Sequence, residues 1–307
     1  MTLALHHDEP SSGENGIETG PYRERARAKV NLTLHVLGKR PDGYHELESL
    51  VVFADLCDEL RFDAGPGGEL SLAGPFAEAV DGENLVLKAK RAAEGWLGQK
   101  ISGAFRLEKN IPVAAGLGGG SSDAAAALRI FLRAYGNGAA PEAFIAEAAA
   151  IGADVPVCLY NRAAWMRGLG ERVAPAANMS ALPAILVNPR VKLSTAEVFK
   201  RLGAGPYRPG EHSCPALFEA DFRSPESAAA VLKLGRNDLE NPAAALEPTV
   251  ERALDALRSR EGCLLARLSG SGPTCFGLFP SAASAKKAAS AIAAAYPSWW
   301  VVPVTLS

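Results

Sequence analysis

Residues Ile111–Asp123 read Ile-Pro-Val-Ala-Ala-Gly-Leu-Gly-Gly-Gly-Ser-Ser-Asp, with four glycines between Gly116 and Gly120. Glycine permits positive φ angles and lets backbone N–H groups converge without interference from a Cβ atom. An alternating stretch at 104–108 precedes this segment and predicts a strand, and an alanine-rich stretch to about Tyr135 follows it and predicts a helix. Converging N–H groups at a helix start form an anion site, which the helix dipole reinforces. The segment therefore predicts a phosphate-binding loop, and the alternative is a flexible loop or a tight strand–helix junction.

The loop matches neither of the two most familiar phosphate motifs. A Walker-type loop ends in Gly-Lys-Ser/Thr, and no lysine follows these glycines. A dinucleotide fingerprint has the form Gly-x-Gly-x-x-Gly, and Ser121 stands where its last glycine would be. A Walker-type NTPase and a dehydrogenase are both disfavoured.

Upstream of the loop, Ala28–Val36 alternates apolar residues with Lys29, Asn31, Thr33 and His35. This period of two predicts a strand on which Lys29 and Asn31 project to the same side. Strands and helices mix along the chain without a regular βαβ alternation, so the predicted fold class is α+β. Further strands are predicted at 50–53, 60–62, 70–72, 155–160, 184–187, 264–268, 274–279 and 300–306, and helices at 85–97, 141–152, 195–202, within 225–260 and at 282–295.

The composition narrows the function classes. A chain of 307 residues suggests about two domains, and a net charge of −2 argues against a nucleic-acid-binding surface. No apolar run approaches the ~18–20 residues of a membrane helix. The five cysteines are scattered without a Cys-x-x-Cys pair, which argues against a disulfide framework or a zinc site. The polar residues 1–22 predict a disordered tail rather than a secretory signal. We expect a soluble cytoplasmic protein.

On these residues the chain resembles the GHMP kinases, the family of galactokinase, homoserine kinase and mevalonate kinase. Their ATP loop has the form Pro-x-x-x-Gly-Leu-Gly-x-Ser-Ser, and Pro112–Ser122 carries one extra glycine. This longer loop and the turn Arg40–Leu47 resemble the branch that phosphorylates the 2-hydroxyl of 4-diphosphocytidyl-2-C-methyl-D-erythritol in the non-mevalonate isoprenoid pathway. Other segments that match this branch are Ala28–Leu32, Gly152–Pro156, Asn237–Leu239 and Leu268–Phe276.

The resemblance implies a two-domain GHMP-kinase fold with a cleft between a nucleotide-binding domain and a C-terminal domain of ferredoxin-like type. The expected boundaries are a tail at 1–22, an ATP-binding catalytic domain at 23–165 joined by the strand 300–307, and a substrate-binding domain at 166–299. The tail and the loop 203–215 depart from the family pattern, and the loop belongs to the expected substrate pocket.

The same resemblance implies that Lys29 and Asp154 pair beside the acceptor hydroxyl, with Asp154 as general base. The residues alone leave open that Asp154 is a turn aspartate satisfied by backbone N–H groups and that Lys29 is an exposed strand lysine. ATP and Mg²⁺ are the expected cofactors, and Ser122 or Asp123 is a candidate contact of the metal, whose ligands stay unassigned. The expected ATP loop comprises Val113, Ala114, Ala115, Gly116, Leu117, Gly118, Gly119, Gly120, Ser121, Ser122 and Asp123, supported by Gly270, Ser271 and Gly272.

Substrate contacts are expected at Asn31, Tyr44, His45, Thr195 and Phe199. The resemblance implies that Tyr44 and Phe199 stack on a cytosine and that His45 hydrogen-bonds this base. Three simpler interpretations stay open: Tyr44 and His45 are surface residues, Phe199 belongs to the core, and Thr195 caps its helix.

Two rival functions also stay open, namely another GHMP kinase of the homoserine or mevalonate type and a non-catalytic nucleotide-binding protein on the same fold. The expected partner is a small-molecule substrate, without nucleic acid or membrane, and the expected state is a monomer or a weak homodimer.

Overall fold

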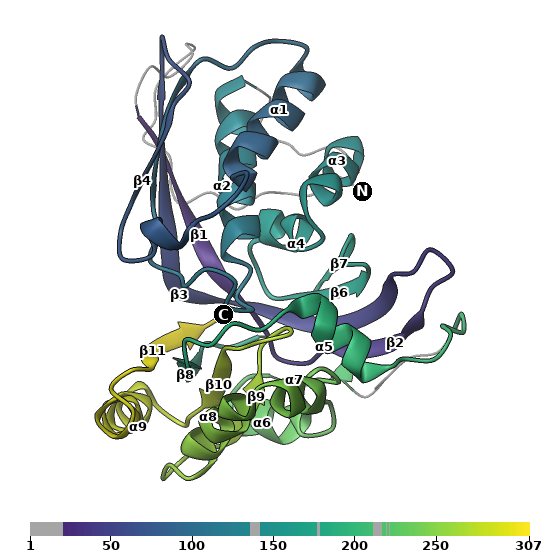
Figure 1. Ribbon diagram of the computed structural model, residues 1–307, viewed down its shortest axis with the longest axis vertical. Helices are drawn as coiled ribbons and strands as arrows, with labels where there is room; N and C mark the ends of the chain where they lie inside the picture. The colour runs from purple at the N-terminus through teal and green to yellow at the C-terminus, as the bar shows by residue number, and fades with distance from the viewer. Residues whose placement is uncertain (1–20, 136–141, 177–178, 211–216, 219, 221) are drawn as a thin grey trace. The chain divides into compact units, whose positions relative to one another are not determined.

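The structure of the protein is a computed structural model that describes residues 21–135, 142–176, 179–210, 217–218, 220 and 222–307 (Figure 1). Residues 1–20 of the tail expected at 1–22 and residues 211–215 of the loop 203–215 lie outside these described residues. Tyr22, which the expected tail includes, begins strand β1 (Tyr22–Asn31) and is only 6% exposed.

The chain forms two compact units, each assembled from separate stretches of sequence. Unit 1 contains Met1–Ala28, Leu56–Val113 and Gly118–Asn161, and unit 2 contains Lys29–Asp55, Ala114–Leu117 and Arg162–Ser307. These boundaries differ from the expected ones, which kept 23–165 together and joined 300–307 to them. The last strand, β11 (Trp300–Leu306), pairs along its whole length with β8 (Leu182–Asn188), and this pairing places it in unit 2.

Unit 1 combines a sheet with a group of helices. The second part of β3 (His45–Ala64) pairs antiparallel with β5 (Gly103–Glu108), and β4 (Leu70–Ala73) runs parallel to β5. Helix α1 packs on α2, α2 packs on α4, and α3 packs on all three. The helical elements are η1 (Ala77–Ala79), α1 (Leu85–Leu97), α2 (Gly119–Tyr135), α3 (Glu142–Ile151) and α4 (Val155–Tyr160).

Helix α4 corrects the prediction of a strand at 155–160. Its residues Val155–Leu159 are all buried, and a short apolar run that is buried on every side carries no periodicity that separates strand from helix. Pro156 falls in the first turn, where a missing N–H group costs no helical hydrogen bond.

The strand predicted at 28–36 is interrupted. Strand β1 ends at Asn31 and β2 (His35–Lys39) begins four residues later. In between, Leu32 N–H donates to Leu50 O, whereas Leu34 N–H donates to Arg236 O, so the backbone changes its pairing partner. The strands predicted at 50–53 and 60–62 are one continuous strand, β3.

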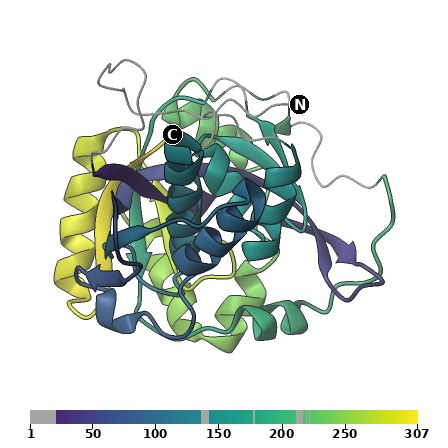
Figure 2. The ribbon, with the colours of Figure 1, turned by 90° about the horizontal axis from the view of Figure 1, so that it is seen from above.

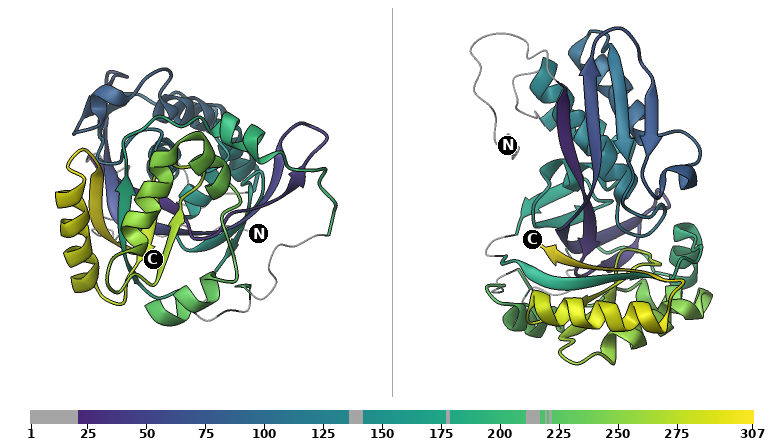
Figure 3. Two further views of the ribbon diagram at one scale, coloured as in Figure 1. Left: turned by 60° about the horizontal axis from the view of Figure 1, so that its bottom comes forward. Right: turned by 90° about the vertical axis from the view of Figure 1, so that its left-hand side faces the viewer.

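Unit 2 contains an antiparallel sheet in the order β11–β8–β10–β9, with β9 at Leu265–Leu268 and β10 at Cys275–Leu278. Helix α9 (Ala282–Ala295) packs on β8 and β11, as Figures 2 and 3 show in yellow, and α8 (Pro248–Arg258) packs on β9 and β10. The succession of β8, helices, β9, β10, α9 and β11 is a ferredoxin-like arrangement. Unit 2 also contains β2, the first part of β3, β6 (Ala164–Gly168), β7 (Arg172–Pro175), α5 (Thr195–Leu202), α6 (Pro225–Leu232) and α7 (Glu240–Leu246).

The α+β class is therefore confirmed. Among the residues that the structure describes, no helix is both long and apolar enough to cross a bilayer.

Candidate active site

The end of β1 carries a buried lysine and a buried asparagine. Lys29 is 4% exposed, which excludes the exposed strand lysine that the sequence left open, and Asn31 is fully buried. Lys29 Nζ donates to Asn31 Oδ1 at 2.9 Å, so the two side chains share one side of the strand as predicted. Asn31 Nδ2 donates to Ser49 Oγ at 2.8 Å, and this bond fixes the amide that orients the ammonium.

The first part of the glycine loop is held against this strand end. Lys29 N–H donates to Leu117 O at 2.8 Å. Asn31 N–H donates to Ser269 Oγ at 3.2 Å, and the Ser269 hydroxyl donates to Gly116 O at 3.0 Å. Gly116 has φ +75°, and a Cβ atom there would lie 2.5 Å from Ser269 O, so only glycine fits this close approach.

The residues predicted to support the phosphate loop, Gly270, Ser271 and Gly272, lie in the loop after β9. Gly270 and Gly272 both have positive φ angles, and Ser271 Oγ lies 2.7 Å from Thr195 Oγ1. Asn237 Nδ2 donates to the carbonyls of Leu268 and Gly270, at 2.9 and 2.8 Å, and these two bonds hold the loop in place. Thr195 does not cap α5, because Ser194 occupies the N-cap position and accepts from Glu197 N–H.

The second part of the glycine loop belongs to unit 1 and starts helix α2. Gly118 has φ +62° and its carbonyl accepts from Ser122 N–H at 2.8 Å. The Ser122 hydroxyl is buried and donates to Arg27 O at 2.7 Å. Ser121 is half-buried, and its Oγ lies 3.6 Å from the position a Cβ would take on Gly152. The Ser122 hydroxyl therefore binds the Arg27 carbonyl, whereas the Ser121 hydroxyl does not make this bond.

Asp154 stands at the N-cap position of α4, half-buried, and its side chain makes no capping hydrogen bond. The Asp154 carboxylate therefore does not cap α4. Gly152 and Ala153 precede it, and Val155 N–H donates to Gly152 O, which closes the turn that presents the carboxylate.

Beneath the start of α2 lies a buried group of three charges. Lys109 Nζ donates to a carboxylate oxygen of Asp58 and, at 2.6 Å, to Oδ2 of Asp123. Burial raises the pKa of Asp123; Lys109 opposes this shift and Asp58 adds to it, and together these effects give a pKa of about 8. The Asp123 side chain is 3% exposed and faces Lys109, so it is not available to a nucleotide or a metal ion at the surface of the loop.

The residues expected to recognise a base are partly brought together. The His45 and Phe199 rings stack with centroids 4.8 Å apart and an interplanar angle of 26°. Burial lowers the pKa of His45, and the charge of Lys39 lowers it further, which favours the neutral ring that can both donate and accept. Tyr44 is 64% exposed and extends from the turn. Phe199 is half-buried and packs against the core of unit 2, so the core interpretation holds for part of its ring.

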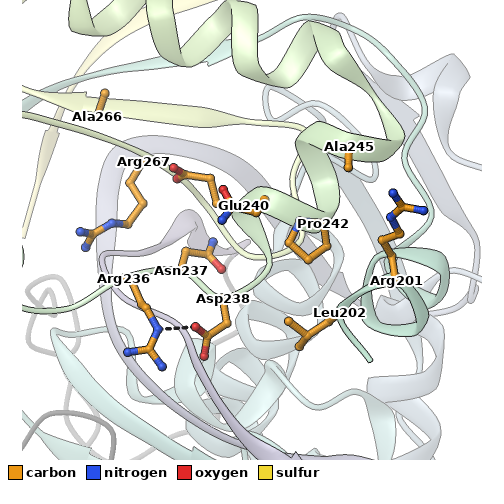
Figure 4. Close-up of a pocket in the computed structure, with 11 residues that line it drawn as sticks. Arg201, Leu202, Arg236, Asn237, Asp238, Glu240, Pro242, Ala245, Ala266 and Arg267 are labelled. Atoms are coloured by element: carbon orange, nitrogen blue, oxygen red, sulfur yellow. Dashed lines mark hydrogen bonds and ion pairs between the residues drawn. The ribbon is translucent and has the colours of Figure 1, made fainter. Parts of the chain in front are cut away.

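A hollow of about 670 Å³ in unit 2 contains none of the expected catalytic residues (Figure 4). Several of its charged side chains pair with one another or with the backbone: Arg236 pairs with Asp238, and the Arg267 guanidinium donates to the carbonyls of Leu232 and Gly235. Glu240 accepts from Leu268 N–H at 2.8 Å.

The chain matches two family models, "GHMP kinases N terminal domain" over residues 84–162 and "GHMP kinases C terminal" over residues 215–298. The 4-diphosphocytidyl-2-C-methyl-D-erythritol kinase of Methylorubrum extorquens is 50% identical to this chain over 287 residues, which cover 92% of this chain and 98% of that protein. The chain belongs to the 4-diphosphocytidyl-2-C-methyl-D-erythritol kinase family, a branch of the GHMP kinases.

Solved structures agree with this family. A crystal structure of a 4-(cytidine 5'-diphospho)-2C-methyl-D-erythritol kinase matches with a TM-score of 0.74 at 33% identity, covering 93% of this chain and 99% of that one. A homoserine kinase from Cytophaga hutchinsonii matches with a TM-score of 0.69 over 95% of this chain and 96% of that one. At 18% identity, this second likeness concerns the fold alone. The GHMP-kinase fold that the sequence predicted is confirmed.

The sequence patterns did not indicate Asp58 and Lys109. Lys109 directly follows the strand predicted at 104–108 and precedes the glycine loop, and a charged residue at the entrance to such a loop is a usable signal. Asp58 lies 51 residues earlier and has no local signal, because only the pairing of β3 with β5 brings it to Lys109.

Proposed function

We propose that this chain transfers the γ-phosphate of ATP to the 2-hydroxyl of 4-diphosphocytidyl-2-C-methyl-D-erythritol, giving the 2-phosphate and ADP. The observation that carries the proposal is the cluster around Ser269. Its hydroxyl accepts from the backbone of Asn31 and donates to Gly116 O, so the strand end with Lys29, the glycine loop and the loop after β9 share one hydrogen-bonded centre. The relative from Methylorubrum extorquens supports the choice of acceptor.

The glycine loop binds the triphosphate through backbone N–H groups at the start of α2, where the helix dipole is positive. The exposed or half-buried positions of the loop are Val113, Ala114, Gly116, Gly118, Gly119, Gly120 and Ser121. Ala115, Leu117, Ser122 and Asp123 are buried and support the loop from inside. Gly270, Ser271 and Gly272 line the phosphates from the loop after β9.

Phosphoryl transfer needs alignment and charge stabilisation more than covalent chemistry. Asp154 accepts the proton of the acceptor hydroxyl, and the Lys29 ammonium stabilises the negative charge that develops on the oxygen. Asn31 holds Lys29 Nζ at 2.9 Å and so keeps the charge in one place, which is what preorganised electrostatic catalysis requires.

The cytidine part of the acceptor binds at Tyr44, His45 and Phe199. An aromatic face and a neutral imidazole that donates and accepts are suited to a flat base with mixed hydrogen-bonding edges. Thr195 contacts the acceptor close to the Ser271 hydroxyl, its neighbour at 2.7 Å.

Mg²⁺ accompanies ATP in this proposal, but the side chains first considered for it do not fit. Ser122 donates to the Arg27 carbonyl, and Asp123 is buried against Lys109. Within the described ranges, His, Cys, Asp and Glu side chains nowhere gather in threes that would suit a metal ion. The cytoplasmic location and the state of association stay predictions.

The test is release of ADP from ATP and Mg²⁺ with 4-diphosphocytidyl-2-C-methyl-D-erythritol, homoserine or mevalonate as the acceptor. We expect turnover with the cytidine compound only. Asp154→Asn should lower kcat by about 10²–10⁴-fold, the usual contribution of a general base, with little change in KM for ATP. Asp63→Asn, an exposed aspartate at the end of β3, is the matched control and should behave as the wild type.

Turnover that survives in Asp154→Asn would keep the kinase and remove Asp154 as its base. Acceptance of homoserine or mevalonate in place of the cytidine compound would keep the family and change the acceptor. Binding of ATP without transfer to any of the three alcohols would favour the non-catalytic rival.

A further inference from the structure

Of the three charges beneath the glycine loop, Asp123 is the last residue of the loop motif, whereas Asp58 and Lys109 lie outside every motif that the proposed reaction uses. Asp58 is fully buried, and Lys109 and Asp123 are each 3% exposed. Removing an ammonium and a carboxylate from water costs several kcal/mol per ion unless their geometry and hydrogen bonds compensate for it. Such a group is weak evidence for stability, and its position suggests another role.

Asp58 connects the ammonium to the backbone that enters the loop. Its Oδ1 accepts from the N–H groups of Asn110 and Ile111, at 2.5 and 2.8 Å. On the other side, the start of α2 rests on the same residues. A Cβ atom on Gly119 would lie 3.3 Å from the Ile111 side chain and 3.6 Å from Lys109 Nζ. The three charges therefore join the segment that leads into the glycine loop to the helix that follows it.

The net charge of Asp58, Lys109 and Asp123 affects how strongly an anionic ligand binds at the start of α2. With Asp123 protonated, Asp58 and Lys109 neutralise each other, whereas ionised Asp123 adds one buried negative charge close to the first turn of α2. Asp123 Oδ1 is buried and has no hydrogen-bond partner among the described residues, so little compensates for that charge. Burial is the main cause that raises the pKa of Asp123 to about 8, and the charged groups that face it are Asp58 and Lys109.

We propose that Lys109 is a positioning residue for the nucleotide: by bridging Asp58 and Asp123 it holds the first turn of α2 in the geometry in which its N–H groups bind the triphosphate. Asp123 is the partner of Lys109 and not a ligand of ATP or Mg²⁺. This inference takes one thing from the proposed function, namely that ATP binds at the glycine loop. It does not depend on the acceptor alcohol.

The first experiment measures the Kd of ATP by calorimetry, together with kcat and both KM values, for wild type and Lys109→Met. We expect the Kd and KM of ATP to rise at least tenfold while KM for the acceptor stays within about twofold. The matched control is Lys100→Met, because the Lys100 side chain is 87% exposed and the variant should bind ATP as the wild type does. Equal losses for ATP and for the acceptor would indicate general damage and overturn the proposal.

Lys109→Met leaves two buried carboxylates without their cation and can fail to fold. The triple variant Asp58→Asn, Lys109→Met, Asp123→Leu removes all three charges, and replacing a buried ionic group by neutral residues is often tolerated. It should fold and still bind ATP at least tenfold more weakly than the wild type. A folded triple variant with wild-type affinity for ATP would mean that the three charges serve folding alone.

Asp123→Asn provides a readout that a purely structural role would not change. Asparagine keeps the acceptor oxygen for Lys109 and cannot ionise. The affinity of the wild type for ATP should fall as the pH rises through about 8, and the affinity of Asp123→Asn should stay level from pH 7 to 9. Parallel profiles, or loss of ATP binding in Asp123→Asn at pH 7, would contradict the proposal. Because the Kd is measured without an alcohol, a wrong acceptor would leave these results unchanged.

Discussion

Single residues in this protein take their roles from burial more than from their type. Lys29 and Lys109 are both lysines next to strand ends, and both are nearly inaccessible. The Lys29 ammonium donates to a neutral amide, the side chain of Asn31. Burial lowers the pKa of Lys109, but the neighbouring Asp123 and Asp58 outweigh burial and raise it above the usual value, so Lys109 keeps its proton between them.

The raised pKa of Asp123 predicts how stability depends on pH. A carboxyl group whose pKa is about 8 in the folded state and 3.8 ordinarily contributes stability below pH 4, and this contribution is lost as the pH rises toward 8. The free energy of unfolding of the wild type should therefore decrease between pH 5 and pH 8.5 relative to that of Asp123→Asn, by at least ~1 kcal/mol.

Urea unfolding at the two pH values measures this difference. Asp81→Asn, which changes an exposed aspartate, is the control and should follow the wild type. If the free energy of unfolding changed by the same amount between the two pH values in the wild type and in Asp123→Asn, Asp123 would be ionised in the folded protein throughout this range.

At the scale of elements, the glycine loop combines two different requirements. Gly116 needs both a positive φ and the absence of a Cβ, because backbone oxygens of Ser269 and Gly272 lie against it. Gly203, which follows α5, has φ +63° but open space around it. The first glycine therefore serves a close backbone contact, and the second only ends a helix.

Gly116→Ala should lower stability by about 1–3 kcal/mol and raise KM for ATP severalfold, because the loop must move away from Ser269. Gly203→Ala should lower stability by only about 1 kcal/mol and leave KM for ATP unchanged. Thermal unfolding and the ADP-release assay separate the two effects. An unchanged KM in Gly116→Ala would mean that the contact with Ser269 does not shape the phosphate loop.

The bounds of several elements can be predicted from the local sequence. Helices α1, α5 and α9 and strand β11 have the predicted bounds, because each has a clear period or cap: Asn84, Ser194 and Ser281 accept hydrogen bonds from the first turns of the three helices. Helix α4 does not follow, because its buried apolar run has no period. The break between β1 and β2 does not follow either, because it depends on Arg236, some 200 residues away.

At the scale of the whole molecule, each compact unit is built from segments that are distant in sequence. Unit 2 needs residues 29–55 as well as 162–307. The Arg267 guanidinium donates to Leu32 O at 2.7 Å, and Val36 N–H donates to Asp238 at 2.8 Å, so the early segment satisfies polar groups of the late one.

The fragment 166–307 should therefore not fold alone, although it contains the β11–β8–β10–β9 sheet. Without residues 29–55 the fragment loses an acceptor of the buried Arg267, and an unsatisfied buried polar group costs about 1–3 kcal/mol or more when charged. Circular dichroism should show no cooperative thermal transition for this fragment. Co-expression with 1–165 should restore a transition, and a cooperative transition of the fragment alone would contradict the prediction.

The fold class, the family and the candidate residues Lys29 and Asp154 could be predicted from the sequence, because glycine spacing, strand alternation and helix caps are local patterns set by backbone geometry. The burial of Lys29, the stacking of His45 on Phe199 and the three charges at Asp58, Lys109 and Asp123 required the folded chain. Each of these depends on contacts between residues many positions apart. The energy of a buried charge depends on which groups surround it, and no local pattern specifies those groups.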